Sequence, residues 1–340
     1  MRSLVWGAGA IGGTLGAHLA RAGGDVTLVD AVVEHVNAIA RDGLRVTGPI
    51  DAFTVRLPAF TPQTLSGTWN EIILATKAHH TGAAVRALLP HLETNGYVVS
   101  AQNGLNELEI AEVVGVERTV GAFVNFGADY MEPGVIHYGG HGAVVVGEID
   151  GRITPRISAL RDAWHHFDPR AMVTPNIWGY LWGKEAYGAI LFATALTNES
   201  IADALALPAY RPLYIALARE ILAVADARGV RPEAFDGFEP AAYLTTAPAG
   251  GAERSLDALV AHNRRSAKSH SGIWRDLAVR KRPTEVDAQL GIIVTLGHES
   301  NVPTPLTARL VTLVHEIERG ARPQSLDTLD ALDQRLTTND

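Results

Sequence analysis

A glycine-rich loop near the start of the chain constrains the fold more than any other feature. Residues Gly7-Ala8-Gly9-Ala10-Ile11-Gly12 follow the pattern GxGxxG, directly after the apolar residues 4–6. Apolar residues then recur at helical spacing. Only glycine permits the tight turn at Gly7, the close approach of a pyrophosphate at Gly9 and the close helix–strand packing at Gly12. The pattern predicts a strand, a loop and a helix whose N-terminus binds dinucleotide phosphates.

The end of the next apolar run indicates which dinucleotide is bound. Residues 26–29 are apolar or β-branched, and the run ends in Asp30, 18 residues after Gly12. A carboxylate at this position accepts hydrogen bonds from both adenosine-ribose hydroxyls and repels a 2′-phosphate. The sequence therefore predicts that NAD(H) is preferred over NADP(H).

Composition excludes several classes of function. A chain of 340 residues is long enough for two domains. The chain has a net charge of −8 and no concentrated stripe of basic residues, which argues against a nucleic-acid partner. The absence of cysteine excludes thiolate catalysis and Cys-ligated metals, and no spacing typical of metal ligands occurs. No apolar stretch approaches the roughly 20 residues of a membrane span, and no secretory segment opens the chain, so we expect a cytoplasmic protein.

The first half of the chain alternates strand-like and helix-like segments. Such alternation specifies a doubly wound, mostly parallel sheet of α/β type. Residues 135–138 and 143–147 are predicted to form a hairpin joined by Gly139-Gly140. From Pro175 onward long amphipathic helices follow, the last of them marked by Leu326, Leu329, Leu332 and Leu336. We place the domains at residues 1–172 and 173–340, with an exposed connection at 240–251.

Five ordered motifs resemble one family. They are the glycine loop, Thr76-Lys77-Ala78, Gln102-Asn103-Gly104, Trp182-Gly183-Lys184 and the segment of residues 282–287. Together they resemble the ketopantoate reductases (2-dehydropantoate 2-reductases) across nearly the whole chain. The resemblance implies a Rossmann domain followed by an all-helical domain like the C-terminal domain of 6-phosphogluconate dehydrogenase. It also implies an active site in the cleft between the domains and a homodimer.

Lys184 and Glu285 are the candidate catalytic residues. Hydride reduction of a ketone leaves an alkoxide that needs a proton, and a partly desolvated lysine among Trp178 and Trp182 is a good proton donor. The resemblance assigns Lys184 the same role, and it implies that Glu285 binds near the nicotinamide and the substrate hydroxyl. The alternatives are a lysine that reaches solvent and a glutamate exposed on a first helical turn.

Lys77 and Asn103 follow strand ends, where open α/β sheets bind ligands. The resemblance implies that Lys77 reaches the cofactor and that the Asn103 amide contacts both cofactor and substrate. A solvated lysine and a simple Asn-Gly turn are the alternatives.

The chain departs from the family at its substrate-binding positions. Where the family carries asparagines one and two turns after the lysine, this chain has Gly188 and Phe192, which predicts a roomier site for a different substrate. Ser271 remains a candidate substrate ligand. For His270, Lys268 and the basic residues 280–282, contact with an anionic ligand and simple solvent exposure both stay open.

These observations predict an NAD(H)-dependent oxidoreductase. Its substrate would be the CH–OH or C=O group of a small 2-hydroxy or 2-keto acid, or a sugar-acid-like compound. Reduction of ketopantoate itself is the first alternative. An NAD-binding sensor without activity and a 3-hydroxy acid dehydrogenase are the others. The sequence does not name the substrate, the direction of the reaction or the oligomer.

Overall fold

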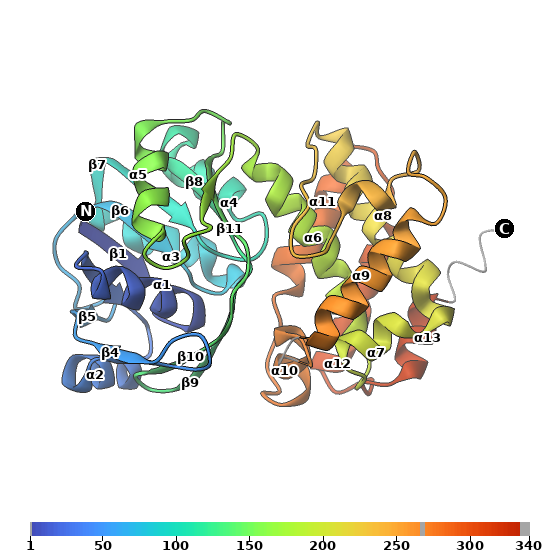
Figure 1. The fold of residues 1–340 in the computed structure, drawn as a ribbon, viewed down its shortest axis with the longest axis horizontal. Coiled ribbons are helices and arrows are strands. Elements are labelled where there is room, and N and C mark those ends of the chain that lie inside the picture. Colours follow the sequence, from blue (N-terminus) through green and yellow to red (C-terminus); the bar gives the residue numbers. More distant parts are fainter. Residues whose placement is uncertain (1, 266–268, 334–340) are drawn as a thin grey trace. The chain divides into compact units, whose positions relative to one another are not determined.

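The computed structural model describes residues 2–265 and 269–333, which form two compact units, Met1–Ile177 and Trp178–Asp340 (Figure 1). The division falls in the first turn of the helix α6 (Ile177–Thr194). Unit 1 is built on a sheet, and unit 2 is helical.

The main sheet of unit 1 has the strand order β12-β11-β8-β7-β6-β1-β2-β5. Its strands are β1 (Arg2–Trp6), β2 (Asp25–Val29), β5 (Ala59–Phe60), β6 (Trp69–Leu74), β7 (Leu92–Ser100), β8 (Thr119–Val124), β11 (Val144–Glu148) and β12 (Met172–Val173). The strands from β5 to β8 run parallel, whereas β11 is antiparallel to β8. The strand order reverses direction across β1, so the predicted doubly wound sheet is confirmed.

Helices cover both faces of this sheet because its central strands are apolar on both sides. Val5 of β1 belongs to the core cluster that also holds Leu15 of α1 and Trp164 of α5, whereas Leu4 faces the cluster with Val85 of α3 and Ile110 of α4. The helices of unit 1 are α1 (Ala10–Arg21), α2 (Val33–Asp42), α3 (Thr81–Leu88), α4 (Glu107–Val114) and α5 (Pro155–Trp164).

A second, four-stranded sheet packs against α1 and corrects one prediction. Its order is β4-β3-β10-β9, with β3 (Leu44–Thr47), β4 (Phe53–Val55), β9 (Gly127–Glu132) and β10 (Val135–Gly140). The predicted hairpin of residues 135–138 and 143–147 is wrong, because β10 pairs with β9 and β3 while β11 pairs with β8. The tight turn lies instead at Pro133-Gly134, where Gly134 has a φ of +77°. The segment between β10 and β11 crosses from one sheet to the other.

Unit 2 consists of helices that are joined by loops of varied length. These are α6, α7 (Ile201–Ala206), α8 (Arg211–Ala227), α9 (Gly251–Arg265), α10 (Gly272–Ala278), the π-helical turn η6 (Asp287–Gly291), α11 (Ile292–Glu299), α12 (Pro305–Glu318) and α13 (Leu326–Asp333). The helices α7 and α10 were not predicted. The stretch expected to be an exposed connection buries Pro240 and Tyr243, and Leu336 of the last predicted helix lies outside the described residues. None of the helices in the described ranges is long and apolar enough to span a membrane.

Candidate functional site

The four cofactor-binding candidates of unit 1 lie at one edge of the main sheet. Trp6, the last residue of β1, pairs with Val29 of β2 and with Leu74 of β6, and Leu74 pairs with Ser100 of β7. The glycine loop, Asp30, Lys77 and Asn103 follow these four strand ends. The carboxyl ends of parallel strands form the ligand-binding edge of an open α/β sheet. The register therefore brings the predicted residues together.

The glycine loop is packed tightly on one side and open on the other. Gly7 has a φ of +100°, and its N–H donates to the carbonyl oxygen of Val29 at 2.8 Å. A Cβ added at Gly12 would lie 2.1 Å from the carbonyl oxygen of Gly7, whereas a Cβ at Gly9 would meet no atom within 4 Å. The helix α1 begins here without a side-chain cap or an acidic residue in its first turn. This open N-terminus suits a bound pyrophosphate.

Asp30 and His35 hold the loop in place. The two carboxylate oxygens of Asp30 accept the N–H groups of Ala8 and Val32, each at 2.9 Å. The fully buried His35 accepts the N–H of Gly134 at Nδ1, so its Nε2 carries the proton and donates to the carbonyl oxygen of Ala8 at 2.9 Å. Sequence reasoning missed His35, since its partners lie 27 and 99 residues away.

Lys77 and Asn103 are both exposed at this edge. The buried Gln102 ties their loops together, because its Nε2 donates to the carbonyl oxygen of Thr76 at 3.0 Å and to Thr81 Oγ1 at 2.9 Å. The Asn103 carbonyl accepts the side-chain amide of Asn106 at 2.6 Å, which leaves the Asn103 side chain itself on the surface. The Asn-Gly turn therefore presents an amide at the ligand edge of the sheet.

In unit 2, Lys184 lies half-buried on α6. On one face, Gly179 accepts the backbone N–H of Glu233 at 2.9 Å, and a Cβ at Gly183 would lie 2.7 Å from the Glu233 carbonyl oxygen. One turn after Lys184, a Cβ at Gly188 would meet only the Gln289 Oε1 among the described atoms, at 3.7 Å. Phe192, which was expected to line the substrate site together with Gly188, is fully buried in the core.

Glu285 is buried, with 8% of its surface exposed, so the interpretation as an exposed first-turn charge is wrong. The residue before it is anchored, because Glu318 Oε1 accepts both the N–H and the hydroxyl of Thr284 at 2.7 Å. His315 bridges Glu318 and Asp287, at 2.7 and 2.9 Å. This clamp of Thr284, Asp287, His315 and Glu318 fixes the segment that carries Glu285, directly before a π-helical turn of the kind often found at functional sites.

The clamp makes stability depend on pH. Partial burial lowers the pKa of His315, but hydrogen bonds to the carboxylates of Asp287 and Glu318 outweigh it, so the pKa is raised above 6.5. A raised folded-state pKa gives stabilisation that is complete below pH 6.5 and is lost as the pH rises through the folded-state value. We expect thermal unfolding midpoints of the native protein and of His315→Gln to differ most near pH 6 and to converge at higher pH. A difference that stays constant from pH 6 to 9 would contradict this.

The remaining substrate candidates take part in local structure. Ser271 Oγ accepts the N–H of Trp274 at 3.1 Å and caps α10. The His270 ring lies 4.0 Å from that of Trp274, and its Nε2 contacts the carbonyl oxygen of Asn198 at 3.2 Å. Arg280 and Arg282 both bind the buried carboxylate of Asp276. Lys268 lies outside the described residues.

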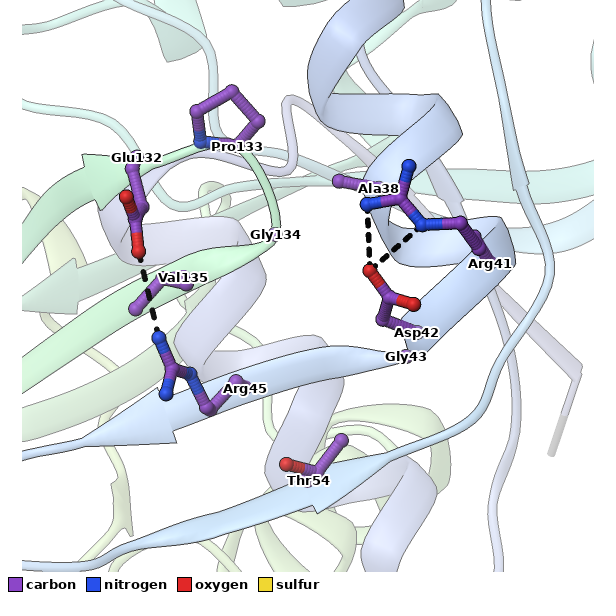
Figure 2. Close-up of a pocket in the computed structure, with 10 residues that line it drawn as sticks. All are labelled: Ala38, Arg41, Asp42, Gly43, Arg45, Thr54, Glu132, Pro133, Gly134 and Val135. Carbon is purple, nitrogen blue, oxygen red and sulfur yellow. Dashed lines mark hydrogen bonds and ion pairs between the residues drawn. The ribbon is translucent and has the colours of Figure 1, made fainter.

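Unit 1 also has a polar hollow of about 400 Å³ beside α2, β3 and β4 (Figure 2). Arg41 binds Asp42 at 2.7 Å and Arg45 faces Glu132 at 3.4 Å, so the charges that line the hollow are balanced. It offers no excess charge to an acidic ligand. Within residues 2–265 and 269–333, no cluster of three or more His, Asp or Glu residues could hold a metal ion.

Comparison with known proteins matches both halves of the chain to one family. The sequence pattern described as "Ketopantoate reductase PanE/ApbA" matches residues 3–151, and the pattern of its C-terminal part matches residues 176–318. A 2-dehydropantoate 2-reductase of Halobacterium salinarum is 26% identical over 322 residues, 94% of this chain and 99% of the relative.

Two solved structures share the fold. A PanE/ApbA family ketopantoate reductase from Ralstonia eutropha has a TM-score of 0.79 at 24% identity, over 94% of this chain and 99% of its own. D-mandelate dehydrogenase, solved with NADH and anilino(oxo)acetate, has a TM-score of 0.81 at 21% identity, with the same coverage. The two sequence patterns together span both units of the molecule. The chain therefore belongs to the ketopantoate reductase family of oxidoreductases.

Proposed function

We propose that this protein is an NAD(H)-dependent oxidoreductase that acts on a small 2-hydroxy or 2-keto acid. The observation that carries the proposal is the strand register that gathers the glycine loop, Asp30, Lys77 and Asn103 at one sheet edge. Bound NAD(H) supplies or accepts the hydride. Residues 7–12 would hold its phosphates, Asp30 would hold the ribose hydroxyls, and Lys77 and Asn103 would hold the rest of the coenzyme.

The helical unit supplies the proton chemistry. When the hydride reaches the carbonyl carbon, negative charge develops on the oxygen. The Lys184 ammonium group donates a proton to that oxygen, and in the reverse direction neutral Lys184 removes the proton from the hydroxyl. The buried carboxylate of Glu285 accepts a hydrogen bond from the substrate hydroxyl and contacts the nicotinamide end of the coenzyme. Asn103, Gly188 and Ser271 line the substrate.

The surroundings of Asp30 support NAD(H) over NADP(H). Burial and the negative charges of Asp30, Glu34 and Glu132 raise the pKa of the Tyr130 hydroxyl above 10. Asp30 and Glu34 therefore add negative charge to the same surroundings of Tyr130, which would disfavour the two added charges of a 2′-phosphate.

Reduction of ketopantoate is a second candidate, favoured by the family membership. The fold shared with D-mandelate dehydrogenase favours a wider range of 2-hydroxy acids. A homodimer is the proposed assembly, and a dimeric ketopantoate reductase from Staphylococcus aureus shares the fold with a TM-score of 0.73 at 18% identity.

The test is a steady-state assay of the purified protein with 2-keto acids, ketopantoate included, and either reduced coenzyme. The reverse assay uses 2-hydroxy, 3-hydroxy and sugar acids with NAD⁺. We expect turnover of at least one 2-keto acid, with a higher kcat/KM for NADH than for NADPH. Tight NADH binding without turnover of any acid would support a sensor instead.

Asp30→Arg tests the coenzyme assignment. The substitution exchanges a charge that repels the 2′-phosphate for a side chain that binds phosphate bidentately. We expect the ratio of kcat/KM for NADPH to that for NADH to rise by about two orders of magnitude, in line with roughly 3 kcal/mol for a charged hydrogen-bonded pair. Asp25→Arg, at the exposed first residue of β2, the strand that precedes Asp30, is the control. An unchanged ratio would remove Asp30 from coenzyme recognition.

A further inference from the structure

The surface of α6 beside Lys184 is bordered by one polar group from a distant part of the chain. Gly188 follows Lys184 by four residues, so both share one face of the helix, separated by about 6 Å along its axis. A Cβ at Gly188 would have only the Gln289 Oε1 within 4 Å among the described atoms, at 3.7 Å. Apart from α6 itself, this carboxamide is therefore the one group among the described residues that borders the space beside Gly188.

Gln289 is a buried residue whose side-chain amide has no hydrogen-bond partner among the described residues. Only 8% of its surface is exposed. Its side chain makes no hydrogen bond to any residue that the structure describes. The amide atoms themselves keep accessible surface, with the oxygen 3.7 Å from the position of a Cβ at Gly188, so they are available to hydrogen-bond a ligand there. Such a group, aimed into open space beside a candidate proton donor, indicates a ligand.

The backbone fixes Gln289 on the same side of its segment as Glu285. The N–H of Gln289 donates to the carbonyl oxygen of Glu285 at 2.9 Å, and both side chains are buried. Gln289 lies in the π-helical turn η6, whose first residue, Asp287, belongs to the clamp. The face of Glu285 and Gln289 therefore meets the face of Lys184 and Gly188 at the contact of Gln289 with Gly188.

We infer that Gln289 determines substrate specificity in the proposed oxidoreductase, and the inference rests on that proposed function. A carboxamide both accepts and donates hydrogen bonds. Its N–H group donates to the carboxylate of the acid, on the carbon next to the reacting one, and the hydroxyl proton is left to Glu285 and Lys184. The acid lies over Gly188, with its hydroxyl oxygen beside Lys184. The hydroxy and keto forms of the acid both keep the hydrogen bond from Gln289.

The test measures acid binding as well as turnover. Calorimetry with the NAD⁺-loaded enzyme gives the Kd of 2-hydroxy acids such as pantoate, mandelate and 2-hydroxyisovalerate, and the matching 2-hydroxy amides serve as uncharged probes. We expect Gln289→Leu to weaken acid binding roughly 10- to 100-fold, as for a lost hydrogen bond to a charged group. Gln289→Glu keeps the acceptor but adds a negative charge. It should therefore weaken binding of the acids and leave binding of the amides nearly unchanged.

Controls separate this proposal from folding and from catalysis. Gln63→Leu makes the same chemical change at an exposed position of unit 1 and should leave the Kd unchanged. Circular dichroism and the Kd of NAD⁺ show whether each variant is folded. If native protein binds acids in a Gln289-dependent way but does not turn them over, the inference holds and the proposed activity fails. If Gln289→Leu binds and turns over acids like the native protein, or native protein binds none of them, the inference is overturned.

Discussion

Replacing Lys184 with alanine is expected to lower kcat by about 10²- to 10⁴-fold, the usual contribution of a positioned general acid. The reason is that Lys184 is the only lysine of α6. It lies one turn before Gly188, where the helix surface is open among the described residues. Binding of NADH should change little, since the candidates for the phosphates and the adenosine ribose belong to unit 1 and Lys184 is not among the coenzyme candidates. Stopped-flow absorbance of NADH in a single turnover measures the hydride-transfer step directly.

Two further variants sharpen this result. Lys184→Arg keeps the positive charge but cannot release a proton near neutral pH, so it should bind the acid and still turn over slowly. Arg254→Ala removes an exposed cation of unit 2 that has no place in the site and should leave kcat unchanged. If Lys184→Ala turned over at the native rate, Lys184 would have no place in the mechanism.

Alanine at Gly12 should damage both folding and coenzyme binding. Its Cβ would lie 2.1 Å from the Gly7 carbonyl oxygen and 2.9 Å from Val5 Cγ1, so helix α1 would have to move away from the sheet. Overpacking of this kind costs about 1–3 kcal/mol, occasionally more. For a unit of this size, that corresponds to a fall of roughly 2–4 °C in the unfolding midpoint per kcal/mol. Differential scanning calorimetry and NADH fluorescence titration measure the two effects.

Gly9→Ala is the matched variant, because its Cβ would meet no protein atom within 4 Å. We expect its unfolding midpoint to stay near the native value. Its Kd for NADH should rise at least tenfold, since the added methyl group occupies the space assigned to the pyrophosphate. Native-like NADH affinity in Gly9→Ala would place the phosphates elsewhere.

The sequence predicted the parts of the fold that depend on local patterns. The glycine loop, the buried runs that end at Trp6 and Val29, and the long helices each follow from short stretches of chain. The order of motifs then predicted the family, which the comparisons confirm.

The second sheet could not be predicted in the same way. Its parallel pairing of β10 with β3 joins residues about 90 positions apart, such as Val135 and Arg45. The Gly139-Gly140 pair looked like a hairpin turn, but here it ends β10 before the chain crosses to the main sheet. Such pairings depend on which distant surfaces become available during folding, and no local propensity encodes them.

In the candidate site too, the positions that follow from local patterns were predicted and those that depend on distant contacts were not. Asp30, Lys77 and Asn103 were predictable because strand ends of a parallel sheet meet at a known edge. Gln289 was not, because its importance comes from a contact across 101 positions with a glycine on another helix. The burial of Glu285 likewise depends on packing within unit 2, which a charged residue at a helix start does not reveal.

The double hydrogen bonding of Asp30 limits how this lineage can change its coenzyme. The carboxylate that would select NAD(H) also holds the N–H groups of Ala8 and Val32, so any exchange for a basic residue removes two supports of the loop at once. An evolutionary or engineered shift toward NADP(H) at this position therefore weakens the loop unless a second substitution restores those supports. Coenzyme preference and loop architecture are inherited here as a single trait.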